Sequence, residues 1–154
     1  MLALPAIRLA TPTDAPAIAR ASRDSIEHDL SWSWTETRVI QAIRDASTNV
    51  SIAASRECLH GFGIMQYLDD DAHLVAIVPT MRHQGLGRRL LAWLEGSAVT
   101  AGLATVRLEC RADNLNAIAF YQRLGYRHVG AVPGYYEGRI DAVQMGKRLQ
   151  RARA

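Results

Sequence analysis

Hydrophobic and polar positions recur along this chain with two different periods, and each period indicates one kind of element. Short runs that are apolar throughout, or that alternate with polar residues, favour β-strands bounded by turn residues. Apolar positions that recur every three or four residues favour helices. The predicted strands are Ala6–Ala10, Val50–Ser55, Leu59–Tyr67, His73–Val78, Ala104–Cys110, Tyr126–Val132 and Asp141–Arg148. The predicted helices run from Thr13 or Asp14 to about Glu27, from Thr35 to Ala46, from Gly85 to about Thr100, and from Asn114 to Arg123.

The order of these elements, β-α-α-β-β-β-α-β-α-β-β, predicts an α/β fold with a mixed sheet. The run from His73 to Val78 is almost entirely apolar, which is typical of a central strand. The last two strands are expected to pair antiparallel through the connector Pro133–Gly138. Because no linker, repeat or low-complexity segment interrupts the 154 residues, we expect one domain, residues 1–154.

Composition narrows the class of protein. Hydrophobic residues make up 49% and charged residues 21% of the chain, as in ordinary globular proteins. The formal net charge is only +3 and the basic residues are scattered, so we expect no nucleic-acid partner. We expect no membrane association and a cytoplasmic location, because the sequence shows neither a signal-peptide pattern nor an apolar run of about eighteen residues. Cys58 and Cys110 are expected to be reduced thiols, and neither has metal-site spacing.

The segment Arg82–Arg88 is the strongest candidate for a binding site. It follows an apolar strand and opens a helix, so its backbone N–H groups lie at the positive end of a helix dipole, where phosphate binds. Gly85 and Gly87 have no Cβ and allow close approach, while Arg82 and Arg88 can add charge-assisted hydrogen bonds. An ordinary strand-to-helix turn is the alternative. The glycine spacing matches neither a P-loop nor a dinucleotide fingerprint.

Several segments, in order, resemble one known family. Arg82–Gly87, with the pattern Arg-x-x-Gly-x-Gly, resembles the pyrophosphate loop of the GCN5-related N-acetyltransferases, the GNAT superfamily. Asn114–Tyr121, with the pattern Asn-x-x-Ala-x-x-x-Tyr, and the later Gly125-Tyr126 resemble a second motif of that family. The tail resembles the ribosomal-protein-alanine acetyltransferase (RimI-like) branch through Tyr135-Tyr136, Asp141-Ala142, Met145 and Lys147. The resemblance covers residues 73–149.

This resemblance implies a fold, a co-substrate and a set of contact residues. The implied fold is the single-domain acyl-CoA N-acetyltransferase fold, a mixed and mostly antiparallel sheet flanked by helices. The implied co-substrate is acetyl-CoA, whose pantetheine arm would lie along the backbone of one strand and whose diphosphate would lie in the glycine loop. The implied contact residues are Val75, Ala76, Ile77, Arg82, His83, Gln84, Gly85, Leu86, Gly87, Arg88, Asn114, Ala117 and Tyr121.

Acetyl transfer from a thioester requires a neutral amine, hydrogen-bond donors for the oxyanion and a proton for the departing thiolate. Glu109 is the candidate base, because it lies near the end of a strand and points away from Leu108 and Cys110. The resemblance also places a catalytic carboxylate at this position. The alternative is a surface carboxylate paired with Arg107 or Arg111.

Two further side chains are candidates for this chemistry. His73 is an alternative base, on the preceding strand, and otherwise an exposed histidine at the start of that strand. Tyr121 is the candidate acid, seven residues after Asn114 and therefore on the same helix face. The alternative for Tyr121 is a core tyrosine, and Asn114 can also act as the N-cap of the helix.

We therefore predict an acetyl-CoA-dependent N-acetyltransferase, in which a primary amine attacks the thioester directly. The acceptor is a protein or peptide N-terminus or a small-molecule amine. A non-catalytic acyl-CoA-binding sensor or interaction module is the alternative, although such a module needs neither Glu109 nor Tyr121. We expect no metal, and a monomer or homodimer. Aromatic residues that either line the acceptor groove or serve packing are Trp32, Trp34, Tyr67, Tyr135 and Tyr136.

Overall fold

The computed structural model describes residues 5–25, 34–56, 58–79 and 85–149. Three residues of the predicted diphosphate loop, Arg82, His83 and Gln84, lie outside this part of the chain. So does Trp32, one of the aromatic candidates for the acceptor groove.

One seven-stranded sheet, in the order β1-β2-β3-β4-β5-β7-β6, forms the centre of the molecule. Only β4 and β5 are parallel, and every other neighbouring pair is antiparallel. The prediction of a mixed, mostly antiparallel sheet with a central fourth strand is therefore confirmed. The strands are β1 (Ala6–Leu9), β2 (Thr48–Ser55), β3 (Cys58–Tyr67), β4 (Asp71–Pro79), β5 (Thr105–Arg111), β6 (Arg127–Tyr136) and β7 (Ile140–Arg148).

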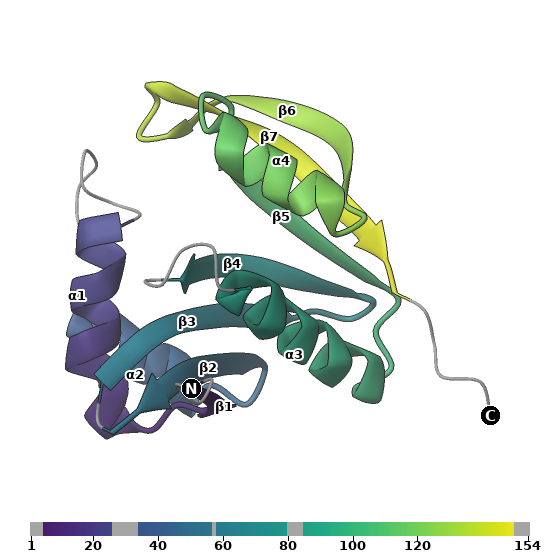
Figure 1. Cartoon of the computed structure of the whole chain (residues 1–154). Helices are drawn as coiled ribbons and strands as arrows, with labels where there is room; N and C mark the ends of the chain where they lie inside the picture. Colours follow the sequence, from purple (N-terminus) through teal and green to yellow (C-terminus); the bar gives the residue numbers. More distant parts are fainter. Residues whose placement is uncertain (1–4, 26–33, 57, 80–84, 150–154) are drawn as a thin grey trace.

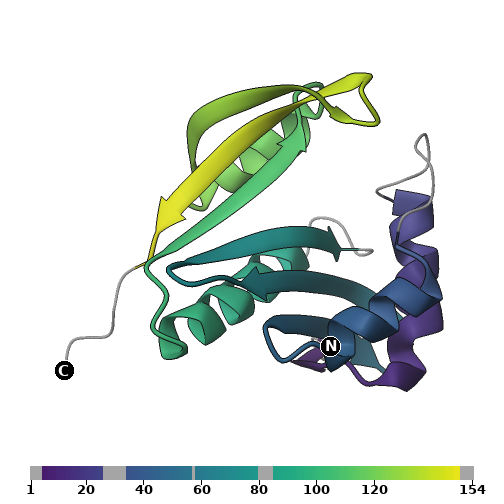
Figure 2. The ribbon, with the colours of Figure 1, turned by 180° about the vertical axis from the view of Figure 1, so that it is seen from behind.

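Helices cover both faces of the sheet, as Figures 1 and 2 show from opposite sides. The helices α1 and α2 pack on one face of β2–β4, and α3 lies on the other face. The helix α4 lies beside β5 and β7 on the same side as α3. The helices are α1 (Ala15–Ser25), α2 (Glu36–Arg44), α3 (Leu86–Thr100) and α4 (Leu115–Arg123), and a short 3-10 turn, Pro12–Asp14, precedes α1.

Some element boundaries differ from the prediction for identifiable local reasons. The second helix ends at Arg44 rather than Ala46, because Asp45 leaves the helical conformation and its carboxylate accepts hydrogen bonds from the Ser47 amide and the Thr48 hydroxyl. The sixth strand continues through most of the predicted connector, and its pairing with β7 shifts register between Val132 and Tyr136. The amide of Gly134 donates to the Asp141 side chain at 2.9 Å there.

The sheet separates into two parts between β4 and β5. These strands pair only from Asp71 to Leu74 on β4 and from Thr105 to Leu108 on β5. The pairing of β4 with β3 skips Val75, which forms a β-bulge. A bulge bends its strand, and the ribbons of β4 and β5 lie apart toward the C-terminal end of β4 in Figure 1. The divergence places β4 residues beyond Leu74, and β5 residues beyond Leu108, on the two sides of the candidate site.

Candidate active site

The diverging part of β4 offers backbone groups to a ligand. Beyond Leu74 the strand runs on to Pro79 without pairing to β5, although it stays paired with β3 on its other side. Unpaired strand N–H and C=O groups can accept an extended ligand as an additional strand. Val75, Ala76 and Ile77, which the resemblance assigned to coenzyme binding, lie in this segment.

The start of α3 lies at the same end of the sheet. Gly85 caps the helix in the left-handed region, with φ of 72°, which favours glycine. The helix begins there, because the Arg89 amide donates to the Gly85 carbonyl at 3.0 Å. Leu86 and Gly87 are buried, and Arg88 is exposed. The described half of the predicted loop thus forms a helix N-terminus of the kind that binds anions.

Glu109 and His73 are in direct contact across the point of divergence. Glu109 is one residue beyond the last β4–β5 pair, and its Oε2 lies 2.5 Å from Nε2 of His73. Its Oε1 lies 3.5 Å from the Arg107 guanidinium, so both carboxylate oxygens face a nitrogen. The side chains of Glu109 and His73 are only 9% and 17% exposed. Glu109 and His73, the two candidates for the base, therefore form one hydrogen-bonded pair. The predicted ion pair of Glu109 with Arg107 is also present.

Tyr121 lies on the other side of β5. It is buried on α4 and packs edge-on against Phe120 and Tyr126, at ring distances of 5.2 and 5.7 Å. Burial raises the pKa of the Tyr121 hydroxyl, and the nearby Cys110 and Tyr136 raise it further. The phenol is therefore protonated throughout the physiological range. No hydrogen-bond partner for this hydroxyl is present among the described residues.

Asn114 has the capping role that was considered for it. Its side-chain oxygen accepts from the Ala117 amide at 3.1 Å, and the residue is exposed at the start of α4. The side-chain NH₂ group of Asn114 can still donate to a ligand. Arg111, the other predicted partner of Glu109, instead pairs with Asp113 at 3.0 Å.

The aromatic candidates fall into two groups. Trp34 is buried in the core beneath α1 and α2, and the Tyr67 hydroxyl accepts from Asn49 at 2.6 Å, so these two residues serve packing. Tyr135 and Tyr136 lie at the end of β6, with rings 4.9 Å apart. Burial raises the pKa of both phenols, and the charge of Glu109 raises it further.

A polar cluster that sequence reasoning did not identify joins α3 to the C-terminal strands. Glu95 accepts from the Tyr126 hydroxyl at 2.7 Å and from the Lys147 ammonium at 3.0 Å. These residues are far apart in sequence, and sequence reasoning named Tyr126 and Lys147 only as parts of two separate motifs.

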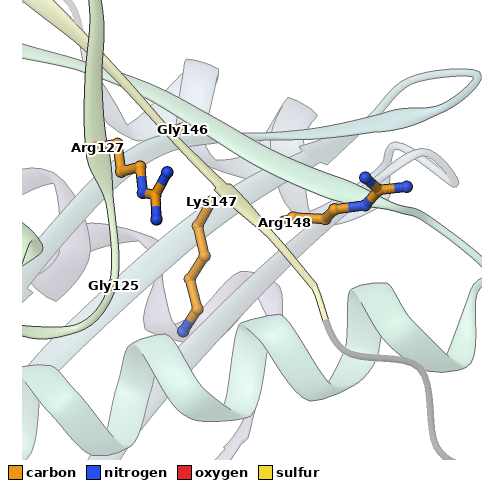
Figure 3. A pocket seen from close by; sticks show the side chains of 5 residues that line it. All are labelled: Gly125, Arg127, Gly146, Lys147 and Arg148. Atoms are coloured by element: carbon orange, nitrogen blue, oxygen red, sulfur yellow. The ribbon is translucent and has the colours of Figure 1, made fainter.

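A shallow hollow of about 400 Å³ lies beside this cluster, and Figure 3 shows the side chains around it. Its lining residues are Gly125, Arg127, Gly146, Lys147 and Arg148. Arg148 pairs with Thr105 at the beginning of β5, whereas Glu109 lies toward its end. The hollow is therefore separate from the site at the diverging strands, and it contains none of the predicted site residues.

Three general features complete the description. Among the described residues, no three side chains of His, Cys, Asp or Glu gather as a metal ion would require. None of the helices in that part of the chain combines the length and apolar character needed to cross a membrane. Both cysteines are free thiols, Cys58 exposed and Cys110 buried, and burial raises the pKa of the Cys110 thiol.

Comparison with protein families gives one match over most of the chain. The model of the acetyltransferase (GNAT) family matches residues 16–126. The [ribosomal protein bS18]-alanine N-acetyltransferase of Escherichia coli strain K12 is 42% identical over 89 residues. That alignment covers 54% of this chain and 60% of the relative, so the chain spans less than two thirds of that protein's length in the match. The protein of the same name from Salmonella typhimurium is 31% identical over 144 residues, covering 90% of this chain and 94% of the relative.

Solved structures agree with these matches. The crystal structure of the ribosomal-protein-S18-alanine N-acetyltransferase from Escherichia coli superposes with a TM-score of 0.82. It is 29% identical in sequence, and the superposition covers 96% of each chain. Ard1 from Thermoplasma volcanium gives the same TM-score at 23% identity, with 95% and 98% coverage, and shares the fold.

Proposed function

The chain belongs to the acetyltransferase (GNAT) family, and from this membership we propose that it transfers the acetyl group of acetyl-CoA to a primary amine. One observation of the structure carries the proposal. The strands β4 and β5 diverge beside a helix N-terminus, with the Glu109 carboxylate on one face of β5 and the Tyr121 phenol toward the other. A coenzyme bound in this arrangement would lie between the Glu109 carboxylate, which can accept a proton, and the Tyr121 phenol, which can donate a hydrogen bond.

The coenzyme would be held by backbone and helix-terminus contacts. Its pantetheine arm would add to the unpaired side of β4 at Val75–Ile77, where amide groups of both partners can exchange hydrogen bonds. Its diphosphate would lie at the segment Arg82–Arg88, at the start of α3. Asn114 at the N-cap of α4, and Ala117 and Tyr121 on that helix, would face the pantetheine and the sulfur.

The reaction would proceed by direct attack. The amine nitrogen bonds to the thioester carbonyl carbon, the carbon–sulfur bond breaks, and coenzyme A leaves as a thiolate that takes up a proton. The attacking amine loses a proton, and the negatively charged pair of His73 and Glu109 accepts it. Tyr121 donates a hydrogen bond to the departing sulfur, because its pKa is raised and it stays protonated.

We propose a peptide N-terminus as the acceptor. The relatives in Escherichia coli and Salmonella typhimurium carry names that specify an alanine N-terminus of a ribosomal protein. Tyr135 and Tyr136, which lie near Glu109, would border the acceptor side of the site. A small-molecule amine is the second candidate acceptor. A cytoplasmic location, and a monomer or homodimer, stay predictions.

An acceptor panel tests the proposal. The purified chain is mixed with acetyl-CoA and with peptides or small amines, and thiol release is followed together with the mass of the acceptor. We expect release with a peptide that begins with alanine, and none with the same peptide acetylated at its N-terminus. If none of the acceptors in the panel gives thiol release, or if only small amines do, the peptide assignment is contradicted. Calorimetric binding of acetyl-CoA without any transfer would favour the non-catalytic binding module.

A further inference from the structure

The contact between His73 and Glu109 indicates that two residues, rather than one carboxylate, form the base. We propose that His73 is the proton acceptor of the reaction and that Glu109 positions and charges it. The inference rests on the proposed function and assigns the proton-accepting atom, Nδ1 of the His73 ring. The family resemblance identified Glu109 as the base and His73 only as its alternative, whereas the structure shows that they are partners.

The hydrogen-bonding pattern of His73 gives the assignment. Its Nε2 lies 2.5 Å from Oε2 of Glu109 in a hydrogen bond, and Oε1 of Glu109 forms an ion pair with Arg107 at 3.5 Å. A neutral imidazole has one N–H and one lone pair. Because a carboxylate accepts hydrogen bonds, the N–H of neutral His73 lies on Nε2, toward Glu109. The lone pair then lies on Nδ1, for which no partner is present among the described residues.

The position of the pair suits a proton acceptor for an amine beside β4. His73 is the residue before the last β4–β5 pair, and Glu109 is the residue after it, so the pair lies where the strands separate. His73 and Glu109 lie on the same face of the sheet. The buried Leu74 and Leu108, which are their neighbours in sequence, lie on the other face. The side chain of His73 is 17% exposed, so it is not sealed in the core.

Among the described residues, one charged side chain and two phenols interact with Glu109 besides His73. Arg107 approaches Glu109 from β5, and the phenols of Tyr135 and Tyr136 lie near Glu109 from β6. The register partners are neutral, Gln144 on β7 for Glu109 and Gln66 on β3 for His73. When the amine gives up its proton, His73 becomes an imidazolium directly beside the Glu109 carboxylate. The product then leaves, and His73 returns the proton to water.

The state of the imidazole can be measured without any acceptor. Nitrogen-15 NMR of the ring of His73, assigned by its loss in His73→Gln, reports which nitrogen carries the proton. We expect the Nε2–H tautomer in neutral wild-type protein, and a shift toward the tautomer mixture of free imidazole in Glu109→Gln. A proton on Nδ1 in the wild type would overturn the inference, whatever the acceptor panel shows.

The rates of three variants test the catalytic role. With the alanine peptide at neutral pH, we expect His73→Gln, Glu109→Gln and the double variant each to lose about 10²-fold or more in kcat. The losses should be similar and not additive, because the residues act as one unit. Rates of His73→Gln should rise with pH in proportion to the free amine. Added imidazole should restore part of the activity of His73→Gly.

His128→Gln is the matched control, since His128 is an exposed strand histidine on β6. Its rate should equal that of the wild type. Unchanged acetyl-CoA affinity and an unchanged melting temperature in His73→Gln would separate a catalytic loss from a folding defect. If His73→Gln keeps its rate within about three-fold while Glu109→Gln loses about 10²-fold, Glu109 acts alone and the inference is wrong. An inactive wild type on every acceptor would instead remove the proposed function.

Discussion

At the scale of single residues, the protonation state of Tyr121 defines what it can contribute. Burial raises its pKa above the ordinary phenol value of about 10, whereas a free thiol has a pKa of about 8.5. Complete proton transfer from Tyr121 to a coenzyme thiolate would therefore be uphill. The phenol is better suited to stabilise the departing sulfur by a hydrogen bond, with water supplying the final proton.

Tyr121→Phe should therefore lower kcat by about 10²-fold, the scale of one lost donor to a developing anion. Acetyl-CoA affinity should change little, because the ring and its packing against Phe120 and Tyr126 are retained. Steady-state kinetics and calorimetry measure both quantities. Tyr67→Phe is the control, since the Tyr67 hydroxyl bonds to Asn49 away from the site. A rate of Tyr121→Phe within about two-fold of wild type would reduce Tyr121 to a packing residue.

The alternation of β5 allowed the direction of Glu109 to be predicted from sequence. Leu108 and Cys110 are buried in the core, and Glu109 points to the other face, as the period of two required. The contact of Glu109 with His73 could not be predicted, because the two are 36 residues apart. It depends on the register of β4 against β5, and two parallel apolar strands can be paired in several registers with similar hydrophobic patterns.

At the scale of elements, the junction of β4 and α3 depends on Gly85. Its φ of 72° would be strained for any residue with a Cβ, at a cost of about 1–2 kcal/mol. A Cβ at this position would meet nothing within 4 Å, so the restriction is conformational rather than steric. The chain can therefore carry a substitution here without a clash in the core.

Gly85→Glu should weaken acetyl-CoA binding by more than about ten-fold, because it adds a carboxylate where the diphosphate is proposed to bind. Two variants separate the causes. Gly85→Ala introduces the same backbone strain without the charge, and Gly96→Glu adds the same charge at an open position later in α3. Calorimetry should show a large loss for Gly85→Glu alone. Equal affinities for Gly85→Glu and Gly96→Glu would place the diphosphate elsewhere.

The sequence predicted the type and order of the elements better than their ends. Apolar periodicity located the four helices and seven strands of the described residues, because most of them bury one face. The bulge at Val75 left no signal, since an apolar run on a central strand has the same composition with or without one extra residue. That bulge accompanies the separation of β4 from β5, so the feature that creates the candidate site was the least predictable.

At the scale of the whole molecule, strand pairing joins the two parts of the sheet only over a short length. The strands β4 and β5 share four register pairs, and the core between α3 and the strands β5 and β7 provides apolar contact. The cluster of Glu95, Tyr126 and Lys147 adds a polar connection across this junction. Because Tyr126 also packs against Tyr121, the same connection supports the candidate site.

Lys147→Met should lower the free energy of unfolding by about 1–3 kcal/mol, because it leaves the largely buried Glu95 carboxylate without its cation. Arg148→Met is the matched control, since Figure 3 shows that Arg148 extends in another direction from Lys147. Its effect should stay within about 0.5 kcal/mol. Urea unfolding of both variants measures the difference. Equal stabilities would mean that Lys147 contributes nothing to the junction.

The same cluster predicts how stability depends on pH in the alkaline range. Burial raises the pKa of the Tyr126 phenol, and the neighbouring Glu95 carboxylate raises it further. The unfolded chain then loses this proton at about pH 10, while the folded protein retains it. The contribution of Tyr126 to the free energy of unfolding is thus complete below about pH 10. It is lost as the pH rises toward the pKa of Tyr126 in the folded protein. Tyr121 and Tyr136 act in the same direction, because their pKa values are also raised.

The free energy of unfolding of the wild type should therefore fall as the pH rises above about 10, by about 1.4 kcal/mol per pH unit for each retained proton. Tyr126→Phe is less stable at pH 8, since the hydrogen bond to Glu95 is gone, but its slope above pH 10 should be smaller by about one proton. Urea unfolding at several pH values between about 8 and 11 gives both slopes. Parallel curves for the two proteins would show that Tyr126 ionises equally in the folded and unfolded states, and the cluster would then hold no protected proton at the junction between the two parts of the sheet.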